Sequence, residues 1–514
     1  MASIRRDPPS AARERYDVIV VGGGIYGVML AFEASRRDLK TLLVEKDDFG
    51  GATSANSLRI IHGGLRYLQT LDLPRFRESV AERRWFLSNF PRLIQSLPCL
   101  MPLYGDGLRR PSIFRVALFL NDILGRPPGG VPPRSARELP PGEVVDAEQV
   151  KRIFPTVDTK GLQGGAIWHD AFMPDPQRVL VTILRKACSR GVTALNYMEA
   201  TELLKDGNAS VGIKAVDREN GDVCEYHAPI VINAAGPWCE GLADRFGSQR
   251  PELFRRSVAW NVLLDRKPAS DHALAVKPNV PHAQTYFVLP WKGRVLAGTG
   301  HVSFRGEGDV PTPSEEQLLG FLNELNVSIP GLDVSGADVL HVFSGFLPVT
   351  RPGGTTLTKR EVIFDHGRNG GPQGLYSVAG IKFTTARKVA GKTLSMIFGK
   401  EKEHEEPRRR GETGDALEYD ESMTGMYDFD WYPRDGDPSW KDPLRRIIEE
   451  ESVLHLDDLM IRRTSLGDNP ARAMNISRET CGIFRWDEAR CRLEIGRLRK
   501  RFRSSVLDLA GTGS

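Results

Sequence analysis

A short β-branched run that ends directly on closely spaced glycines constrains the fold of this chain more than any other feature. The run is Tyr16–Val21, and Gly22-Gly23-Gly24-Ile25-Tyr26-Gly27 follows it with GxGxxG spacing. Residues 28–37 predict a helix and residues 41–45 a second strand, which ends on an acid about 20 residues after the glycines. This order predicts a β-α-β unit that binds a dinucleotide, with an ordinary glycine-rich turn as the alternative.

Each part of this unit has a separate physical task. Gly22 permits the tight turn, Gly24 lets the backbone approach a pyrophosphate, and Gly27 lets the helix pack on the strand. The helix N-terminus then faces the phosphates, and Glu45 meets the ribose hydroxyls. The spacing alone does not distinguish FAD from NAD. The predicted dinucleotide contacts in this unit are Gly22, Gly24, Ile25, Gly27 and Glu45.

Composition sets the outer limits. The 514 residues suffice for two or three domains, and a net charge of +4 is too small to indicate a nucleic-acid partner. The six cysteines show no CxxC pair and no metal-ligand spacing, so we expect no metal site. Residues 3–15 lack the apolar core of a secretory signal, and no apolar run approaches the roughly 20 residues of a spanning helix. We therefore expect a cytoplasmic protein.

The segment after the second strand carries a family resemblance. Lys46-Asp47-Asp48-Phe49 leads to Ala52-Thr53-Ser54-Ala55-Asn56-Ser57 and then to His62-Gly63-Gly64-Leu65-Arg66-Tyr67-Leu68. These stretches resemble the EKDDF, ATS and HGGLRYL segments of the FAD-dependent glycerol-3-phosphate dehydrogenases, within the D-amino-acid-oxidase-like FAD-dependent oxidoreductases. The resemblance implies FAD as cofactor, with contacts from Lys46, Thr53, Ser54, Ser57, Gly63 and Gly64. It places Arg66 and Tyr67 beside the substrate, although a surface role for Arg66 is the alternative.

Three later segments extend the resemblance. Residues 230–238 resemble the family's NAAGPW segment, and residues 374–387 resemble its GGKLTTYR segment. The cofactor contacts that these two segments imply are Ala235, Gly236, Gly380, Lys382, Phe383 and Thr384. Hydroxyl and amide groups at the start of a helix suit the electron-rich side of a reduced flavin. Trp168-His169-Asp170 resembles an acidic family segment, in which His169 and Asp170 are either an acid/base pair or a turn.

Because the cofactor segments lie far apart, the predicted architecture is α/β and discontinuous. A Rossmann-like FAD-binding domain comprises residues 14–90, 160–254 and 361–398. A β-rich substrate domain is inserted as residues 91–159 and 255–360, with strands expected at 258–264, 285–290 and 294–299. Residues 399–420 form a charged linker, and residues 421–514 form a C-terminal helical domain.

The implied reaction is oxidation of a secondary alcohol by hydride transfer to flavin N5, with the electrons passing to a quinone or another acceptor. The predicted catalytic residues are Lys382, Arg66, Tyr67 and His62, of which His62 is a candidate proton acceptor without a firm assignment of the base. Two departures put the substrate in question. Leu347 replaces an arginine of a GxRP segment, with Arg351 four residues on, and Asn261 ends a segment where the family has KGxH. His301 is a smaller departure, where the family has GTTD.

These departures leave three functions open. The first is a glycerol-3-phosphate dehydrogenase, the second is a family member acting on a non-phosphorylated hydroxy or amino compound, and the third is a non-catalytic FAD-binding protein. The final helix carries Cys491, Ile495, Leu498 and Phe502 on one face among basic residues. It either lies peripherally on the anionic inner surface of a membrane or docks on its own domain. A homodimer is a further expectation.

Overall fold

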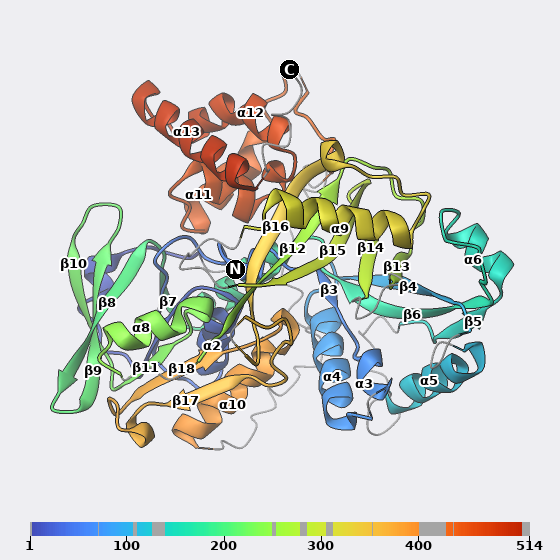
Figure 1. Cartoon of the computed structure of the whole chain (residues 1–514). Coiled ribbons are helices and arrows are strands. Elements are labelled where there is room, and N and C mark those ends of the chain that lie inside the picture. Colours follow the sequence, from blue (N-terminus) through green and yellow to red (C-terminus); the bar gives the residue numbers. More distant parts are fainter. Residues whose placement is uncertain are drawn as a thin grey trace, which may run out of the picture.

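A computed structural model describes residues 3–69, 71–105, 110–125, 139–248, 253–277, 285–304, 312–351, 353–399, 428–434 and 436–505. The statements below concern these residues. The predicted linker lies almost wholly outside them. The chain is a mixed α/β protein with a mainly parallel sheet, a large mixed sheet beside it and helices at the C-terminal end (Figure 1). The predicted fold class is confirmed.

The first sheet is the predicted nucleotide-binding sheet. Its order is β17-β18-β11-β1-β2-β7, and every neighbouring pair is parallel except β17 with β18. The strands are β1 (Val18–Val21), β2 (Thr41–Val44), β7 (Thr193–Leu195), β11 (Ile230–Asn233), β17 (Val362–Asp365) and β18 (Leu375–Ala379). All four residues of β1 and of β2 are buried, because both faces of this sheet are covered.

Alternate side chains of β1 enter two different cores. Val18 and Val20 pack with the helices α2 (Ile25–Ser35), α7 (Pro176–Ser189) and α10 (Ala386–Phe398). Ile19 and Val21 pack on the other side against an antiparallel sheet of β8 (Met198–Asp206), β9 (Ala209–Asp217) and β10 (Val223–His227), and against α8 (Cys239–Arg245). The period of two along a strand divides an unbroken apolar run between these layers.

The second sheet has nine strands in the described residues. Its order is β16-β12-β15-β14-β13-β4-β6-β3, with β5 paired to β6. The strands are β3 (Ile60–Ile61), β4 (Gln95–Leu103), β5 (Glu143–Val145), β6 (Gly164–Phe172), β12 (Arg256–Leu264), β13 (Ala273–Val276), β14 (Tyr286–Trp291), β15 (Arg294–Ser303) and β16 (Val339–Pro348). The strands expected from residues 258–264, 285–290 and 294–299 are present as β12, β14 and β15. β3 and β6 join this sheet although the sequence grouped them with the FAD-binding domain.

Helices cover the second sheet and its edges. On one face, α9 (Glu315–Ser328) begins with a capping box between Ser314 and Gln317 and buries Phe321 edge-on against Trp260. The helices α3 (Leu65–Gln69), α4 (Leu73–Asn89), α5 (Pro111–Leu124) and α6 (Ala147–Ile153) lie around β4 to β6. A short helix, α1 (Pro8–Ala11), precedes β1.

The C-terminal helices form a separate core above both sheets (Figure 1). They are α11 (Lys441–Glu450), the π-helical segment η8 (Asp458–Arg463), α12 (Pro470–Ile483) and α13 (Glu488–Ser505). The apolar face of α13 is turned inward, with Leu498 fully buried and Cys491 and Phe502 nearly so. The sequence left two hypotheses for this helix, and the structure shows it docked on its own domain. Among the described helices none is both long and apolar enough to cross a bilayer.

Candidate active site

The predicted dinucleotide contacts converge because they follow parallel strands. Gly22 follows β1, Glu45 follows β2, Ala235 follows β11 and Gly380 follows β18, so all four lie at the carboxyl ends of the sheet. In open α/β sheets this edge is where ligands bind. A cavity of about 1160 Å³ opens there, and these four residues are among those that line it.

The glycine turn has no room for side chains. Gly22 has a φ of +113°, and a Cβ on it would lie 2.6 Å from the carbonyl oxygen of Ala234. A Cβ on Gly27 would lie 1.8 Å from the carbonyl oxygen of Gly22. Gly24 caps α2 without a side chain, and the amide of Ile25 donates to the Ser54 hydroxyl at 3.0 Å. The turn therefore presents backbone to the cavity, as a pyrophosphate requires.

Glu45 is held at the cavity wall by backbone groups. Its carboxylate accepts the amide of Gly23 at 2.6 Å and the amide of Asp47 at 2.9 Å. Burial raises the pKa of Glu45, while these two hydrogen bonds act in the opposite direction. A carboxylate with a fixed orientation in the cavity suits the hydroxyls of a ribose.

The segment after Glu45 connects the nucleotide sheet to the second sheet. The Asn56 amide nitrogen donates to the carbonyl oxygen of Ser344 on β16 at 2.7 Å, and Asn261 on β12 donates to the carbonyl oxygen of Asn56 at 2.9 Å. A Cβ on Gly345 would lie 3.1 Å from the Thr53 side chain. The second sheet thus roofs the segment that carries the predicted contacts Thr53, Ser54 and Ser57, all of which line the cavity.

His62 is paired with the carboxylate of Asp170, which the sequence analysis had considered only together with His169. Its Nδ1 lies 3.2 Å from Oδ2 of Asp170, whose Oδ1 accepts the amide of Gly63 at 2.6 Å. Asp170 also accepts from Arg83 at 2.9 Å and from the indole of Trp168 at 3.2 Å. Burial raises the pKa of Asp170, but His62, Arg83 and the Gly63 amide outweigh it and lower the pKa to about 2.

The two interpretations of His169 and Asp170 are therefore both wrong. The residues lie in β6, where neighbouring side chains point to opposite faces. Asp170 reaches the HGGLRYL segment, because β6 pairs with β3 and His62 directly follows β3. The acidic segment was the available signal for Asp170, but its partner lies 108 residues away.

Lys382 and Tyr67 meet across the site. The Lys382 ammonium donates to the Tyr67 hydroxyl and lies 4.6 Å from the centre of the Tyr67 ring. The hydroxyl of Tyr26 donates to the Lys382 carbonyl at 2.8 Å, and a Cβ on Gly380 would overlap the Tyr26 ring. Two segments, those of Tyr26 and Tyr67, thus hold Lys382 in place, and Phe383 and Thr384 continue from it into α10.

Most of the predicted residues line one cavity, and five do not. The cavity-lining set is Gly22, Gly24, Ile25, Glu45, Lys46, Thr53, Ser54, Ser57, His62, Ala235, Gly236, Gly380, Lys382, Phe383 and Thr384. Gly27, Gly63 and Gly64 are structural neighbours of that set. Tyr67 reaches it through Lys382, and Arg66 is exposed on α3. Its role beside the substrate stays a prediction.

Two residues that depart from the family pattern lie in the roof of the cavity. Leu347 and Asn261 both line the cavity, and Asn261 accepts the Thr299 hydroxyl at 2.9 Å. His301 pairs with the Ser257 hydroxyl at 2.7 Å, and burial lowers the pKa of His301. Arg351 is exposed and is not part of the wall.

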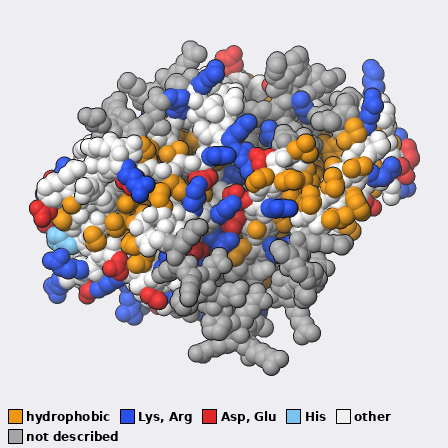
Figure 2. Space-filling model, turned by 90° about the horizontal axis from the view of Figure 1, so that it is seen from below, with side chains coloured by type: hydrophobic (Ala, Val, Ile, Leu, Met, Phe, Trp, Pro, Cys, Tyr) orange, Lys and Arg blue, Asp and Glu red, His pale blue; other side chains and the backbone are white. Residues whose placement is uncertain are grey.

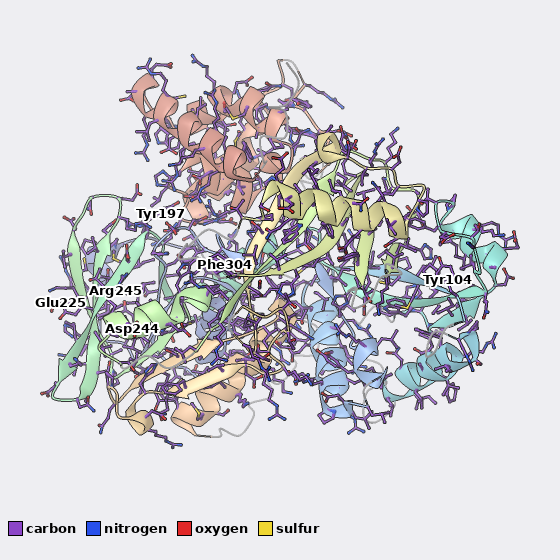
Figure 3. The ribbon with its side chains drawn as sticks, viewed as in Figure 1. Tyr104, Tyr197, Glu225, Asp244, Arg245 and Phe304 are labelled. Carbon is purple, nitrogen blue, oxygen red and sulfur yellow. The ribbon has the colours of Figure 1, made fainter. Side chains whose placement is uncertain are left out.

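Sequence reasoning missed several cationic wall residues. Arg256 lies at the start of β12, pairs in register with Pro348, and stacks on Phe346 and on Phe304, which Figure 3 labels near the centre. Arg245 lines the wall from α8, and Arg462 and Arg501 line it from the C-terminal helices. An arginine that begins a largely apolar strand was the one available signal. The C-terminal pair had none, because only docking brings it to the cavity.

Comparison with known proteins agrees with this geometry. The family model described as FAD dependent oxidoreductase matches residues 17–401. The chain belongs to this family. It is therefore an FAD-dependent oxidoreductase enzyme, and the predicted cofactor FAD is confirmed. The glycine cradle, the oriented Glu45 carboxylate and the cavity volume fit that cofactor.

Individual relatives narrow the resemblance. A glycerol-3-phosphate dehydrogenase of Synechocystis is 31% identical over 408 residues, which are 77% of this chain and 72% of that protein. Glycerol-3-phosphate dehydrogenase 1 of Mycobacterium tuberculosis is 32% identical over 391 residues, 74% of this chain and 72% of its own. The structure of a Bacillus halodurans glycerol-3-phosphate dehydrogenase complexed with FAD covers 98% of this chain and 97% of its own, with a TM-score of 0.72 at 20% identity.

Proposed function

We propose that this enzyme oxidises the secondary alcohol of glycerol 3-phosphate. The observation that carries the proposal is the contact of His62 with the buried Asp170, because His62 and Lys382 both line the cavity. An alcohol dehydrogenase must remove the proton of the hydroxyl group and a hydride from the carbon that bears this group. The relatives named above support the choice of substrate.

His62 suits the role of proton acceptor. With Nδ1–H donated to Asp170, its Nε2 keeps a lone pair for the substrate hydroxyl. The Asp170 carboxylate then stabilises the imidazolium that forms. FAD, when bound, supplies the acceptor for the hydride. The alcohol thus loses one proton and one hydride and becomes a ketone.

Lys382 and Arg256 suit the role of partners for the substrate phosphate. Lys382 is fixed by its contacts with Tyr67 and Tyr26. Arg256 lies on β12, which pairs with the strand that contains Leu347. Its partner in the register is Pro348, the residue after Leu347. Both side chains line the cavity. A guanidinium from β12 would thus supply some of the charge that Leu347 lacks.

Anaerobic reduction of the bound flavin tests the proposal. We expect glycerol 3-phosphate to bleach the flavin absorbance, with glycerol far weaker because it has no phosphate for the cations to hold. Reduction by a non-phosphorylated hydroxy acid or by L-proline, without reduction by glycerol 3-phosphate, would reassign the substrate. Absence of reduction by all of these would show that the substrate is a compound of another class.

We further propose that the electrons pass to a quinone at an anionic membrane surface and that α5 makes the contact. The apolar face of α13 is buried, which argues against the final helix. On α5, Val116, Phe119, Leu120 and Ile123 are exposed, and Arg110 and Arg115 lie beside them. Figure 2 shows hydrophobic side chains with Lys and Arg around them on this side. An apolar helical face with basic neighbours suits an anionic bilayer.

Vesicle sedimentation tests the membrane contact. We expect binding to phosphatidylglycerol vesicles and little binding to phosphatidylcholine vesicles. The double variant V116S/F119S should lose the binding, whereas the matched double variant V211S/V223S, at exposed sites on β9 and β10, should keep it. Equal binding of both variants would contradict a role for α5.

A further inference from the structure

The C-terminal helices contact the cofactor wall through a buried ion pair. Arg463 of η8 donates from Nη1 to Oδ2 of Asp48 at 2.6 Å and from Nη2 to Oδ1 at 2.7 Å, and both side chains have no exposed surface. Asp48 belongs to the segment Lys46–Gly51. This segment lies between Glu45, the predicted partner of the ribose hydroxyls, and the turn at Thr53. This bidentate geometry fixes direction as well as distance.

A second set of hydrogen bonds surrounds this pair. Asn196, just after β7, donates to Asp48 at 3.0 Å and to the carbonyl oxygen of Ser452 at 2.8 Å. Tyr197 donates to Asp458 at 2.6 Å and accepts from Arg497 at 3.1 Å. Figure 3 shows Tyr197 directly beneath the C-terminal helices. The end of the nucleotide sheet and the C-terminal helices are thus joined around Asp48.

The contact extends to the cavity itself. Arg462, the residue before Arg463, lines the cavity together with Gly50 and Gly51. A Cβ on Gly51 would lie 3.1 Å from the Arg462 Nε, so the guanidinium packs against the backbone of this segment. Arg501 of α13 lines the same cavity and bonds Asp457 at 3.2 Å. The C-terminal helices therefore support the segment and form part of its wall.

We propose that the C-terminal helical domain contributes to FAD binding. Asp48 and Arg463 are positioning residues, which hold the segment Lys46–Gly51 so that Glu45 and Thr53 keep the geometry that FAD needs. FAD binding and docking of the C-terminal helices are then linked, and by reciprocity each strengthens the other.

The test compares two carboxylates at the same domain contact. Asp48→Asn weakens the pair at the cofactor wall. Asp468→Asn is the matched control, because Asp468 also joins the C-terminal helices to the rest of the chain, through Lys292 at 2.6 Å, and none of these control residues lines the cavity. The full-length chain is freed of FAD and titrated with FAD while flavin fluorescence is recorded, and thermal unfolding is measured with and without FAD.

We expect D48N to raise the dissociation constant for FAD about tenfold or more, and D468N to leave it nearly unchanged. FAD should raise the unfolding temperature of D468N as much as that of the unaltered chain, and that of D48N by less. Arg463→Lys keeps the charge and loses the bidentate geometry, so its dissociation constant for FAD should lie between those of the unaltered chain and D48N. This variant replaces D48N in the test if D48N fails to fold. Equal FAD affinity for all variants, or equal losses for D48N and D468N, would overturn the proposal.

Discussion

Replacing Asp170 by asparagine tests the role of the His62 pair. The pKa of Asp170 falls from its ordinary value of 3.8 to about 2, and one pKa unit corresponds to about 1.4 kcal/mol. Folding therefore favours the carboxylate by about 2 kcal/mol. Because the folded pKa is the lower one, this contribution is present above pH 3.8 and is lost as the pH falls through about 2. Above pH 3.8, D170N should therefore lower the free energy of unfolding by up to about 2 kcal/mol.

The same substitution should slow the chemical step. A hydrogen bond to a charged group contributes about 1.5 to 3 kcal/mol, which corresponds to roughly ten- to a hundredfold in rate. Anaerobic stopped-flow reduction of the flavin by glycerol 3-phosphate measures this rate directly. Asp122→Asn is the control, because Asp122 also accepts a backbone amide, that of Gly142 at 3.0 Å, but lies outside the cavity wall. A rate for D170N within twofold of the unaltered enzyme would refute the reasoning.

Three further substitutions probe the cofactor turn, the substrate end and the domain contact. Gly27→Ala should abolish FAD retention, measured as flavin content of the purified protein, since its Cβ would overlap backbone; Gly391→Ala on α10, where nothing lies within 4 Å, should keep FAD and gain up to about 1 kcal/mol of stability. Leu347→Arg should lower KM for glycerol 3-phosphate about tenfold or more, from an added charged hydrogen bond, with no change for glycerol; an equal change for both would exclude a phosphate contact. Burial lowers the pKa of His455, but two glutamates outweigh it and raise the pKa to about 9, so its contribution to stability is complete below pH 6.5 and is lost as the pH rises through about 9. His455→Gln should flatten the unfolding temperature across that window, and an unchanged slope would contradict the assignment.

Local sequence patterns identified many of the residues that line the cavity. The turn from Gly22 to Gly27 and the position of Glu45 follow from steric and phosphate-binding requirements that act within a few residues. Such requirements are written into neighbouring positions and do not depend on the rest of the fold. Residues 230–238 and 374–387 were assigned by their resemblance to family segments, and in the structure each contains a strand that leads to the cavity.

The remaining site residues depend on contacts between distant segments. Asp170 meets His62 only because β3 and β6 pair, and the period of two along β6 separates Asp170 from His169. Arg256 reaches the cavity through the register of β12 with β16. The C-terminal arginines Arg462 and Arg501 reach it through domain docking.

The sequence by itself therefore determined that this chain binds FAD and belongs to a known oxidoreductase architecture. The tertiary structure decided which carboxylate pairs with His62, which cations line the cavity, and that residues of the C-terminal helices form part of its wall. The physical reason is the separation along the sequence of the residues that interact. Backbone conformation and close packing at a glycine turn are set by adjacent residues, whereas the pairing of buried charges is set by strand register and helix docking across hundreds of residues.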